Sequence, residues 1–375
     1  PKVLVRDHYI SSALSGDATS GTLTVKLDLD NRDGLTASKQ YEVRLIDPSG
    51  NVIQTQTGNA DFTATETAKS LSILFEGLSE LTPWTSDHPA LYTVEIIQKD
   101  AAGKEESVTA TPYGFCVATI KNNQFLVNGK RVLMKGVNTQ DTHPIMGRTM
   151  DIETMWTDLV IMKQNNVNMV RSSHYPRSPK MNAMMDYIGM YQMDEADVEF
   201  HKNWSNGGRI HIASSWRAPI VDRITRMVLR DRNHPCVVSW SLGNESDGGV
   251  NLNHAYNAAR ALDPRPIHYE GIQAAGKKNY YSKYVDMVSM MYPSFKKIKD
   301  KADYIIIDFH AEETAEKIIK KIGGRATMFV GTSGSNVEHR IAFQYKALGC
   351  NGIYNSFSLG PEVRYDTMPF GFENH

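Results

Sequence analysis

Cysteine is scarce in this sequence, which has three cysteines among 375 residues. Cys116, Cys236 and Cys350 lie far apart and form no C-x-x-C pair. The spacing therefore indicates neither a disulfide framework nor a zinc site, and it is typical of buried free thiols.

Long apolar runs and an excess of one charge sign are also missing. The formal net charge is -1, which gives no electrostatic reason to expect nucleic acid or an anionic membrane as partner. No apolar run approaches the roughly 20 residues of a membrane span, and the first residues do not resemble a signal peptide. This is an ordinary soluble globular composition. It leaves open a cytoplasmic or periplasmic location and whether copies of the chain form a homo-oligomer.

The first 117 residues carry segments in which apolar and polar residues alternate. These segments are residues 22–29, 41–46 and 91–97. A period of two indicates half-buried strands, and turn-forming residues at 47–51 and 100–104 separate them. Residues 1–117 are therefore predicted to form a small β-sandwich of the immunoglobulin-like kind.

From about residue 118 the pattern changes to short β-type runs that alternate with amphipathic stretches such as 151–165 and 216–230. The β-type runs are residues 131–134, 168–171, 191–194, 237–240, 266–269, 286–290, 304–307, 327–330 and 352–354. This alternation predicts a (β/α)8 TIM barrel over residues 118–375, with one late run in excess. A doubly wound sheet is the alternative. No glycine-rich phosphate fingerprint follows the first strand, which disfavours a nucleotide site.

Polar and charged residues follow successive strands of the predicted barrel. In chain order they are Asn138, His143, Arg171, His174, Asp194, Glu195, Glu199, His201, Asn244, Glu245, Glu270 and Tyr292. Any one of them has a structural explanation; Arg171, for example, could pair internally with Glu195 or Asp194. Together they are expected to converge on the rim where barrel active sites lie, because burying that many charges without partners or a ligand is costly.

Paired carboxylates without a nucleotide or haem motif favour acid/base hydrolysis of a polar substrate. Glycoside cleavage uses one carboxylic acid to protonate the leaving oxygen, and in retaining enzymes a second carboxylate about 5 Å away attacks the sugar. The aromatic residues Tyr175, Trp204 and Tyr292 could stack on sugar faces or could simply pack. The sequence therefore predicts a carbohydrate substrate.

Four long motifs resemble glycoside hydrolase family 2, the group of β-galactosidases and β-glucuronidases. They are residues 128–138, 162–176, 194–201 and 230–246, and the last ends in Gly243-Asn244-Glu245-Ser246. That ending, with Tyr269-Glu270-Gly271 downstream, looks more like the β-galactosidases. Residues 83–92 resemble the end of the family's immunoglobulin-like domain, and the resemblance covers roughly residues 70–295.

The resemblance implies roles for individual residues. Glu245 would be the general acid/base, and Asn244 would bind the sugar 2-hydroxyl. The sugar site would also include Arg171, His174, His143 and Tyr292. Glu199, His201 and Glu245 would gather around a Mg²⁺ ion, although histidine is not the ligand that magnesium favours. In the metal-free alternative, Glu199 and His201 only orient Glu245.

The sequence departs from the family in several places. The family's N-terminal jelly-roll domain and the domains after the barrel have no counterpart, Gln140 replaces an active-site histidine, and residues 355–357 replace a Trp-Asp-Trp motif. The family's Cys-Glu-Tyr-Ala-His nucleophile motif on strand seven is also missing. One alignment places Asp308 in that position, and the other places Gly331 there with no nucleophile. The remaining carboxylate candidates are Glu312, Glu338 and Glu362.

The leading hypothesis is hydrolysis of a terminal β-galactoside or related β-glycoside with retention. Glu245 is then the acid/base and Asp308 the nucleophile. The alternative is a catalytically inactive relative that binds carbohydrate or has a structural role.

Overall fold

The computed structural model describes most of the chain. It covers residues 1–122, 124–143, 145–201, 208–246, 248–270, 284–291, 305–309 and 328–331, with backbone pairing alone for 288, 290, 291 and the last two ranges. The chain divides into two compact units. One consists of Pro1–Val117 with Arg232–Pro235, and the other of Ala118–Asp231 with Cys236–His375.

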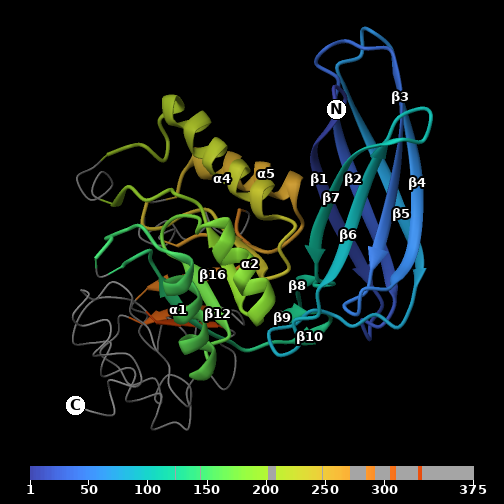
Figure 1. The fold of residues 1–375 in the computed structure, drawn as a ribbon. Helices are drawn as coiled ribbons and strands as arrows, with labels where there is room; N and C mark the ends of the chain where they lie inside the picture. Colours follow the sequence, from blue (N-terminus) through green and yellow to red (C-terminus); the bar gives the residue numbers. More distant parts are fainter. Residues whose placement is uncertain are drawn as a thin grey trace. The chain divides into compact units, whose positions relative to one another are not determined.

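The first unit is a sandwich of two antiparallel sheets (Figure 1). The three-stranded sheet has the order β1 (Leu4–Leu14), β2 (Gly21–Asp30) and β5 (Ala68–Leu78). The four-stranded sheet has the order β4 (Val52–Phe62), β3 (Ala37–Ile46), β6 (Tyr92–Lys99) and β7 (Glu105–Tyr113). The three alternating segments noted in the sequence correspond to β2, β3 and β6. The sandwich prediction is therefore confirmed.

Alternation along each strand builds the core of the sandwich. In β2, Leu23, Val25 and Leu27 are fully buried while the residues between them retain solvent contact, as a period of two requires. The aromatic rings of Tyr92 and Phe115 meet edge to face, with centroids 4.9 Å apart. Such pairs add about 0.5–1.5 kcal/mol to the energy of burial.

The second unit begins with a small antiparallel sheet of three short strands. These are β8 (Ala118–Lys121), β9 (Gln124–Val127) and β10 (Lys130–Arg131). Asn128 and Gly129 connect β9 to β10 with φ of 52° and 75°, the backbone that a two-residue hairpin turn needs. Because Arg131 ends this hairpin, the first barrel strand begins only at Met134, and the strand predicted at residues 131–134 is corrected accordingly.

Within the part of the chain that the structure describes, eight parallel strands form one sheet in the second unit. In chain order they are β11 (Met134–Thr139), β12 (Met169–Ser172), β13 (Tyr191–Glu195), β14 (Val237–Ser241), β15 (Ile267–His268), β16 (Val288–Met291), β17 (Ile305–Phe309) and β18 (Met328–Gly331). The sheet order is β15-β14-β13-β12-β11-β18-β17-β16. The first and eighth strands pair, as in a barrel. Among the described residues, β15 and β16 share no ladder, so the ring has one open seam.

Helices follow the early strands of this sheet. They are α1 (Ile152–Gln164), α2 (Pro179–Ile188), α4 (Arg217–Asp231) after a 3-10 turn (Ser214–Trp216), and α5 (Val250–Leu262). Helix α1 lies beside α2, and α4 beside α5 (Figure 1). Asp151 caps α1 by accepting a hydrogen bond from the Thr154 amide at 2.7 Å. The helices predicted at 151–165 and 216–230 are confirmed as α1 and α4.

Two further predictions concern the whole chain. Seven of the nine β-type runs correspond to β12 to β18, the run at 131–134 overlaps β11 only at Met134, and the ninth, residues 352–354, lies outside the described residues. No helix in the described part of the chain is both long and apolar enough to cross a membrane.

Candidate active site

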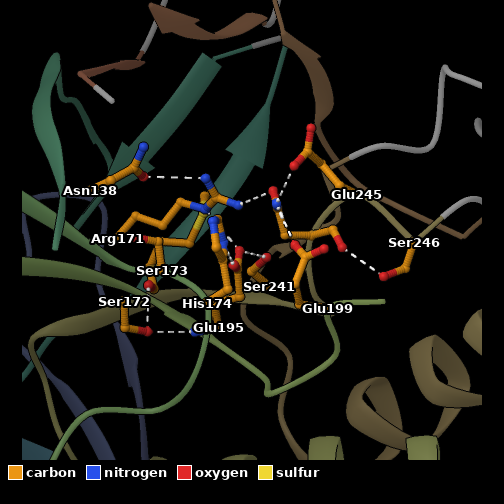
Figure 2. A network of polar contacts seen from close by, with 12 residues as sticks. Asn138, Arg171, Ser172, Ser173, His174, Glu195, Glu199, Ser241, Glu245 and Ser246 are labelled. Atoms are coloured by element: carbon orange, nitrogen blue, oxygen red, sulfur yellow. Dashed lines mark hydrogen bonds and ion pairs between the residues drawn. The ribbon is translucent and has the colours of Figure 1, made fainter. Parts of the chain in front are cut away.

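The candidate site lies where β11 to β15 end. Asn138 pairs with Arg171 in the parallel register of β11 and β12, and Glu195 pairs with Ser241 in that of β13 and β14. Because parallel strands end at a common edge, this register brings four buried polar side chains to one level. Figure 2 shows the resulting network.

Arg171 is the centre of this network. Its Nε donates to Glu195 Oε2 at 2.8 Å, Nη1 donates to Asn138 Oδ1 at 3.2 Å, and Nη2 donates to Asn244 Oδ1 at 2.8 Å. The side chain is almost fully buried, and its charge is balanced by Glu195. The internal ion pair considered from the sequence therefore exists, and its partner is Glu195.

Glu195 receives hydrogen bonds on both carboxylate oxygens. Oε2 also accepts from Ser241 Oγ at 2.6 Å, and Oε1 lies 2.7 Å from His174 Nδ1. Burial alone would raise the pKa of Glu195. The Arg171 guanidinium and the hydrogen bonds from His174 and Ser241 outweigh burial and lower the pKa to about 2. Glu195 is therefore ionised at neutral pH and fixes the positions of Arg171 and His174.

Asn244 connects this network to Glu199 and Glu245. Its Nδ2 donates to Glu199 Oε2 at 2.7 Å and lies 3.3 Å from Glu245 Oε2. The preceding Gly243 has φ of 138°, and a Cβ there would fall on the Val198 carbonyl oxygen. Glu245 itself has φ of 41°, a strained backbone of the kind that recurs at functional sites.

Glu199, His201 and Glu245 form a cluster that solvent reaches. Their ligand-type atoms all lie within 4.8 Å of one another, and His201 Nδ1 is 3.1 Å from Glu245 Oε2. Partial desolvation raises the pKa of Glu199, and the neighbouring Glu245 carboxylate adds to this effect. The hydrogen bond from Asn244 lowers the pKa but does not cancel the rise. Two carboxylates that crowd each other beside an imidazole are a donor set suited to a divalent cation.

The other predicted site residues lie apart from this network or outside the described residues. His143 is held in a local turn, where its Nδ1 accepts hydrogen bonds from the amides of Ile145 and Met146 at 3.1 and 3.0 Å. Tyr175 accepts a hydrogen bond from the Asp141 amide at 2.8 Å. Glu270 is buried, and its backbone carbonyl accepts from the Glu245 amide at 3.0 Å. Five further predicted residues lie outside the described residues: Trp204, Tyr292, Glu312, Glu338 and Glu362.

Asp308 belongs to β17, which is seventh in chain order among the strands of the sheet. The Asp308 backbone pairs with Met291 on one side and Val330 on the other, one residue before β17 ends. Gly331 belongs instead to the eighth strand, β18. Which of the two alignments open from the sequence identifies the nucleophile stays a prediction.

Sequence reasoning missed two polar partners beneath Glu195. Ser241 Oγ, which donates to Glu195, lies 2.8 Å from Nδ1 of the buried His268. Every residue of β14 is buried, so no alternation in the sequence showed which face of the strand Ser241 occupies. The one available signal was its place directly before the Leu242-Gly243-Asn244-Glu245 run.

Family comparisons agree with this architecture. The family model described as "Glycosyl hydrolases family 2, TIM barrel domain" matches residues 118–332, and the model "Glycosyl hydrolases family 2" matches residues 3–115. The chain therefore belongs to glycoside hydrolase family 2, with a barrel domain preceded by a sandwich domain.

Among curated proteins, the chain is similar to β-galactosidases. It is 35% identical over 297 residues to that of Pectobacterium atrosepticum, covering 78% of this chain and 28% of that protein. It is 34% identical over 275 residues to that of Photobacterium profundum, covering 72% of this chain and 26% of that protein. The chain thus spans about a quarter of these relatives' length.

Among solved structures, a β-glucuronidase from Bacteroides uniformis has a similar fold, with a TM-score of 0.69. Its sequence is 15% identical, and the match covers 88% of this chain and 46% of that one. At this identity the likeness concerns the fold alone.

Proposed function

We propose that this chain carries the catalytic barrel of a retaining β-glycosidase that acts on terminal β-galactosides or related β-glycosides. The observation that carries the proposal is the position of Glu245 just after β14, with Asn244 and His201 within hydrogen-bonding distance and Glu199 within 4.8 Å. The β-galactosidase relatives support the choice of sugar.

Glu245 is the proposed general acid/base. Its carboxyl group is partly open to solvent, so it can reach both a substrate oxygen and a water molecule. It would protonate the leaving oxygen as the glycosidic bond breaks. As a carboxylate it would then take a proton from the water that releases the sugar. Asn244 and Arg171 would hold the sugar through their amide and guanidinium groups.

Asp308 is the proposed nucleophile. A carboxylate at the end of the seventh strand would attack the anomeric carbon while the bond to the leaving oxygen breaks, and water would later displace it. Asp308 is one methylene shorter than glutamate, so the reach to the sugar would have to come from the backbone of β17.

A Mg²⁺ ion is the proposed cofactor, held by Glu199, His201 and Glu245. Bound there, it would supply positive charge between two crowded carboxylates and hold Glu245 in place. Calorimetric titration of the chelator-treated chain with Mg²⁺ tests the site. We expect binding to the wild type and strongly reduced binding to Glu199→Gln. Equal binding to both would contradict the assignment.

Hydrolysis of nitrophenyl β-galactoside tests the proposed activity, with nitrophenyl β-glucuronide as the competing substrate. We expect the galactoside to be preferred and Glu245→Gln to lower kcat/KM by about 10²–10⁴-fold. Glu153→Gln, an exposed carboxylate change in the first turn of α1, is the control and should leave the rate unchanged. Equal rates for wild type and Glu245→Gln would contradict the acid/base role.

The inactive, carbohydrate-binding alternative is favoured by one observation, the absence of a glutamate from β17. Asp308→Asn separates the two functions. If Asp308 is the nucleophile, the variant retains sugar binding but loses turnover, and the wild type releases a sugar of retained anomeric configuration. If the wild type binds a thiogalactoside without hydrolysing the nitrophenyl galactoside, the alternative holds.

A further inference from the structure

The donors and acceptors in the hydrogen bonds that join Glu195, Ser241 and His268 can be assigned in only one way. Glu195 is an ionised carboxylate, so it can only accept. Ser241 has a single hydroxyl hydrogen, which the 2.6 Å contact to Glu195 Oε2 requires it to donate. Its Oγ must then accept from His268 Nδ1, at 2.8 Å. The proton of His268 therefore lies on Nδ1.

Other properties of His268 agree with this direction. Burial and the charge of Arg171 lower the pKa of His268 to about 3, so the ring is neutral and carries one proton. Its Nε2 has no hydrogen-bond partner among the described residues. An unpartnered buried acceptor costs less than an unpartnered donor, which fits a proton on Nδ1.

The same reasoning applies to His174 on the other side of Glu195. Its Nδ1 lies 2.7 Å from Glu195 Oε1, and a carboxylate oxygen at that distance requires a proton on the nitrogen. In the neutral ring, Nε2 is then left as a hydrogen-bond acceptor. About 28% of the His174 side chain is exposed, so a ligand can reach it.

We propose that Glu195 is a positioning residue that fixes the Nδ1-protonated tautomer of His174, so that His174 offers a sugar hydroxyl an acceptor. Ser241 and His268 hold Glu195 from beneath, and Arg171 holds it from the side. The role in sugar binding rests on the proposed function. The assignment of the tautomer does not.

Glu195→Gln provides a selective test because its shape hardly changes while one oxygen becomes NH₂. Arg171 Nε and Ser241 Oγ both donate to the position of Oε2, so the amide oxygen must take that place. The NH₂ group then faces His174 Nδ1 and donates to it. His174 must move its proton to Nε2, and the substrate meets a donor instead of an acceptor.

The tautomer is measured by NMR of ¹⁵N-histidine-labelled chain, in which the two ring nitrogens of a neutral histidine have different shifts. His174→Gln assigns the signal. We expect a proton on Nδ1 in the wild type and on Nε2 in Glu195→Gln. A neutral wild-type ring protonated on Nε2 would overturn the proposal, and this result needs no variant of Glu195 to fold.

Kinetics with nitrophenyl β-galactoside test the consequence for binding. Glu195→Gln removes the acceptor that His174 offers the sugar and also the counter-charge of the buried Arg171. Both changes weaken sugar binding, so KM should rise by at least about 2- to 10-fold while kcat changes less. Partial unfolding would instead lower kcat and leave KM as it was. Asp194→Asn, an adjacent buried carboxyl change on the other face of β13, is the matched control and should alter neither constant.

The two hypotheses fail in different ways. A wild type that hydrolyses no glycoside removes the proposed function, while the NMR result still decides the tautomer. A folded Glu195→Gln variant with an unchanged tautomer and an unchanged KM removes the positioning role and leaves the proposed function standing.

Discussion

Gly243 shows how one residue shapes the site. It has φ of 138°, and an added Cβ would lie against Val198, with the Val198 Cβ at 2.8 Å. Gly243→Ala should therefore lower the free energy of unfolding by about 2–4 kcal/mol, from the strained backbone and the clash together. Because Asn244 and Glu245 follow directly, kcat/KM should also fall. Urea unfolding and steady-state kinetics provide the two measurements.

Gly50→Ala separates backbone strain from the clash. Gly50 has φ of 91°, and an added Cβ would meet nothing within 4 Å. Its substitution should cost only about 1–2 kcal/mol and leave kinetics unchanged. A Gly243→Ala variant no less stable than Gly50→Ala would show that the Val198 contact yields, and the structural role assigned to Gly243 would be wrong.

At the scale of residues, the sequence predicted the solvent-accessible cluster of carboxylates and histidine better than the buried hydrogen-bond network around Arg171 and Glu195. Glu199, His201 and Glu245 were predicted as one group from the resemblance to family 2, and the structure brings them together. Their role as metal ligands stays a prediction. The hydrogen bond between Ser241 and His268 depends on the register of β14 against β15, which no local pattern in the sequence encodes.

Strand β13 carries two adjacent carboxyl groups on opposite faces, with opposite pKa shifts. Glu195 faces Arg171, and its pKa is lowered. For Asp194, burial and then the nearby Asp231 charge raise the pKa well above its ordinary value. Its Oδ1 accepts from Ser172 Oγ at 3.1 Å. Alternation along one strand thus gives two adjacent carboxyl groups opposite pKa shifts.

Asp194→Asn should change how stability depends on pH. The folded pKa of Asp194 lies above the unfolded one, so its contribution is complete below about pH 4 and is lost as pH rises toward the folded value. Asparagine cannot ionise, so the stability of the variant does not fall in this way as pH rises. The variant should gain stability relative to wild type as pH rises, by at most about 1.4 kcal/mol per pH unit. Urea unfolding at several pH values measures the difference.

An exposed carboxyl on α4 provides the comparison for Asp194. Asp222 pairs with Arg226 at the surface, and Asp222→Asn should change stability by no more than about 0.5 kcal/mol at any pH. A stability difference between Asp194→Asn and wild type that stays constant or shrinks with rising pH would show that Asp194 is ionised in the folded chain.

At the scale of elements, local patterns predicted the sandwich strands β2, β3 and β6 and the helices α1 and α4. They failed at residues 131–134, where the Asn128-Gly129 turn placed Arg131 in a hairpin and shifted the first barrel strand toward Thr139. A hairpin of two short strands and a single longer strand can contain the same β-forming residues, so composition alone does not distinguish them. Pairing with Met169–Ser172 decides which residues join the barrel.

At the scale of the whole molecule, the sandwich has a hydrophobic core of its own. All members of its buried cluster, from Val3 to Phe115, lie within the first 117 residues. A chain of this length can bury enough apolar surface to fold alone. We therefore expect residues 1–117, expressed separately, to unfold in one cooperative transition with a stability of about 5–10 kcal/mol.

Two spectroscopic probes test whether the sandwich unfolds in one step. The far-ultraviolet signal follows the sheets, and the near-ultraviolet signal follows the buried aromatic residues Trp84, Tyr41 and Tyr92. Leu27→Ala, in the core, should lower stability by about 2–5 kcal/mol, whereas Leu74→Ala, about half exposed at 46%, should cost roughly 1 kcal/mol or less. Transitions that do not coincide, or equal effects of the two substitutions, would mean that the sandwich needs the rest of the chain to pack its core. Coincident transitions would show that the sandwich folds without the unit that carries the candidate active site.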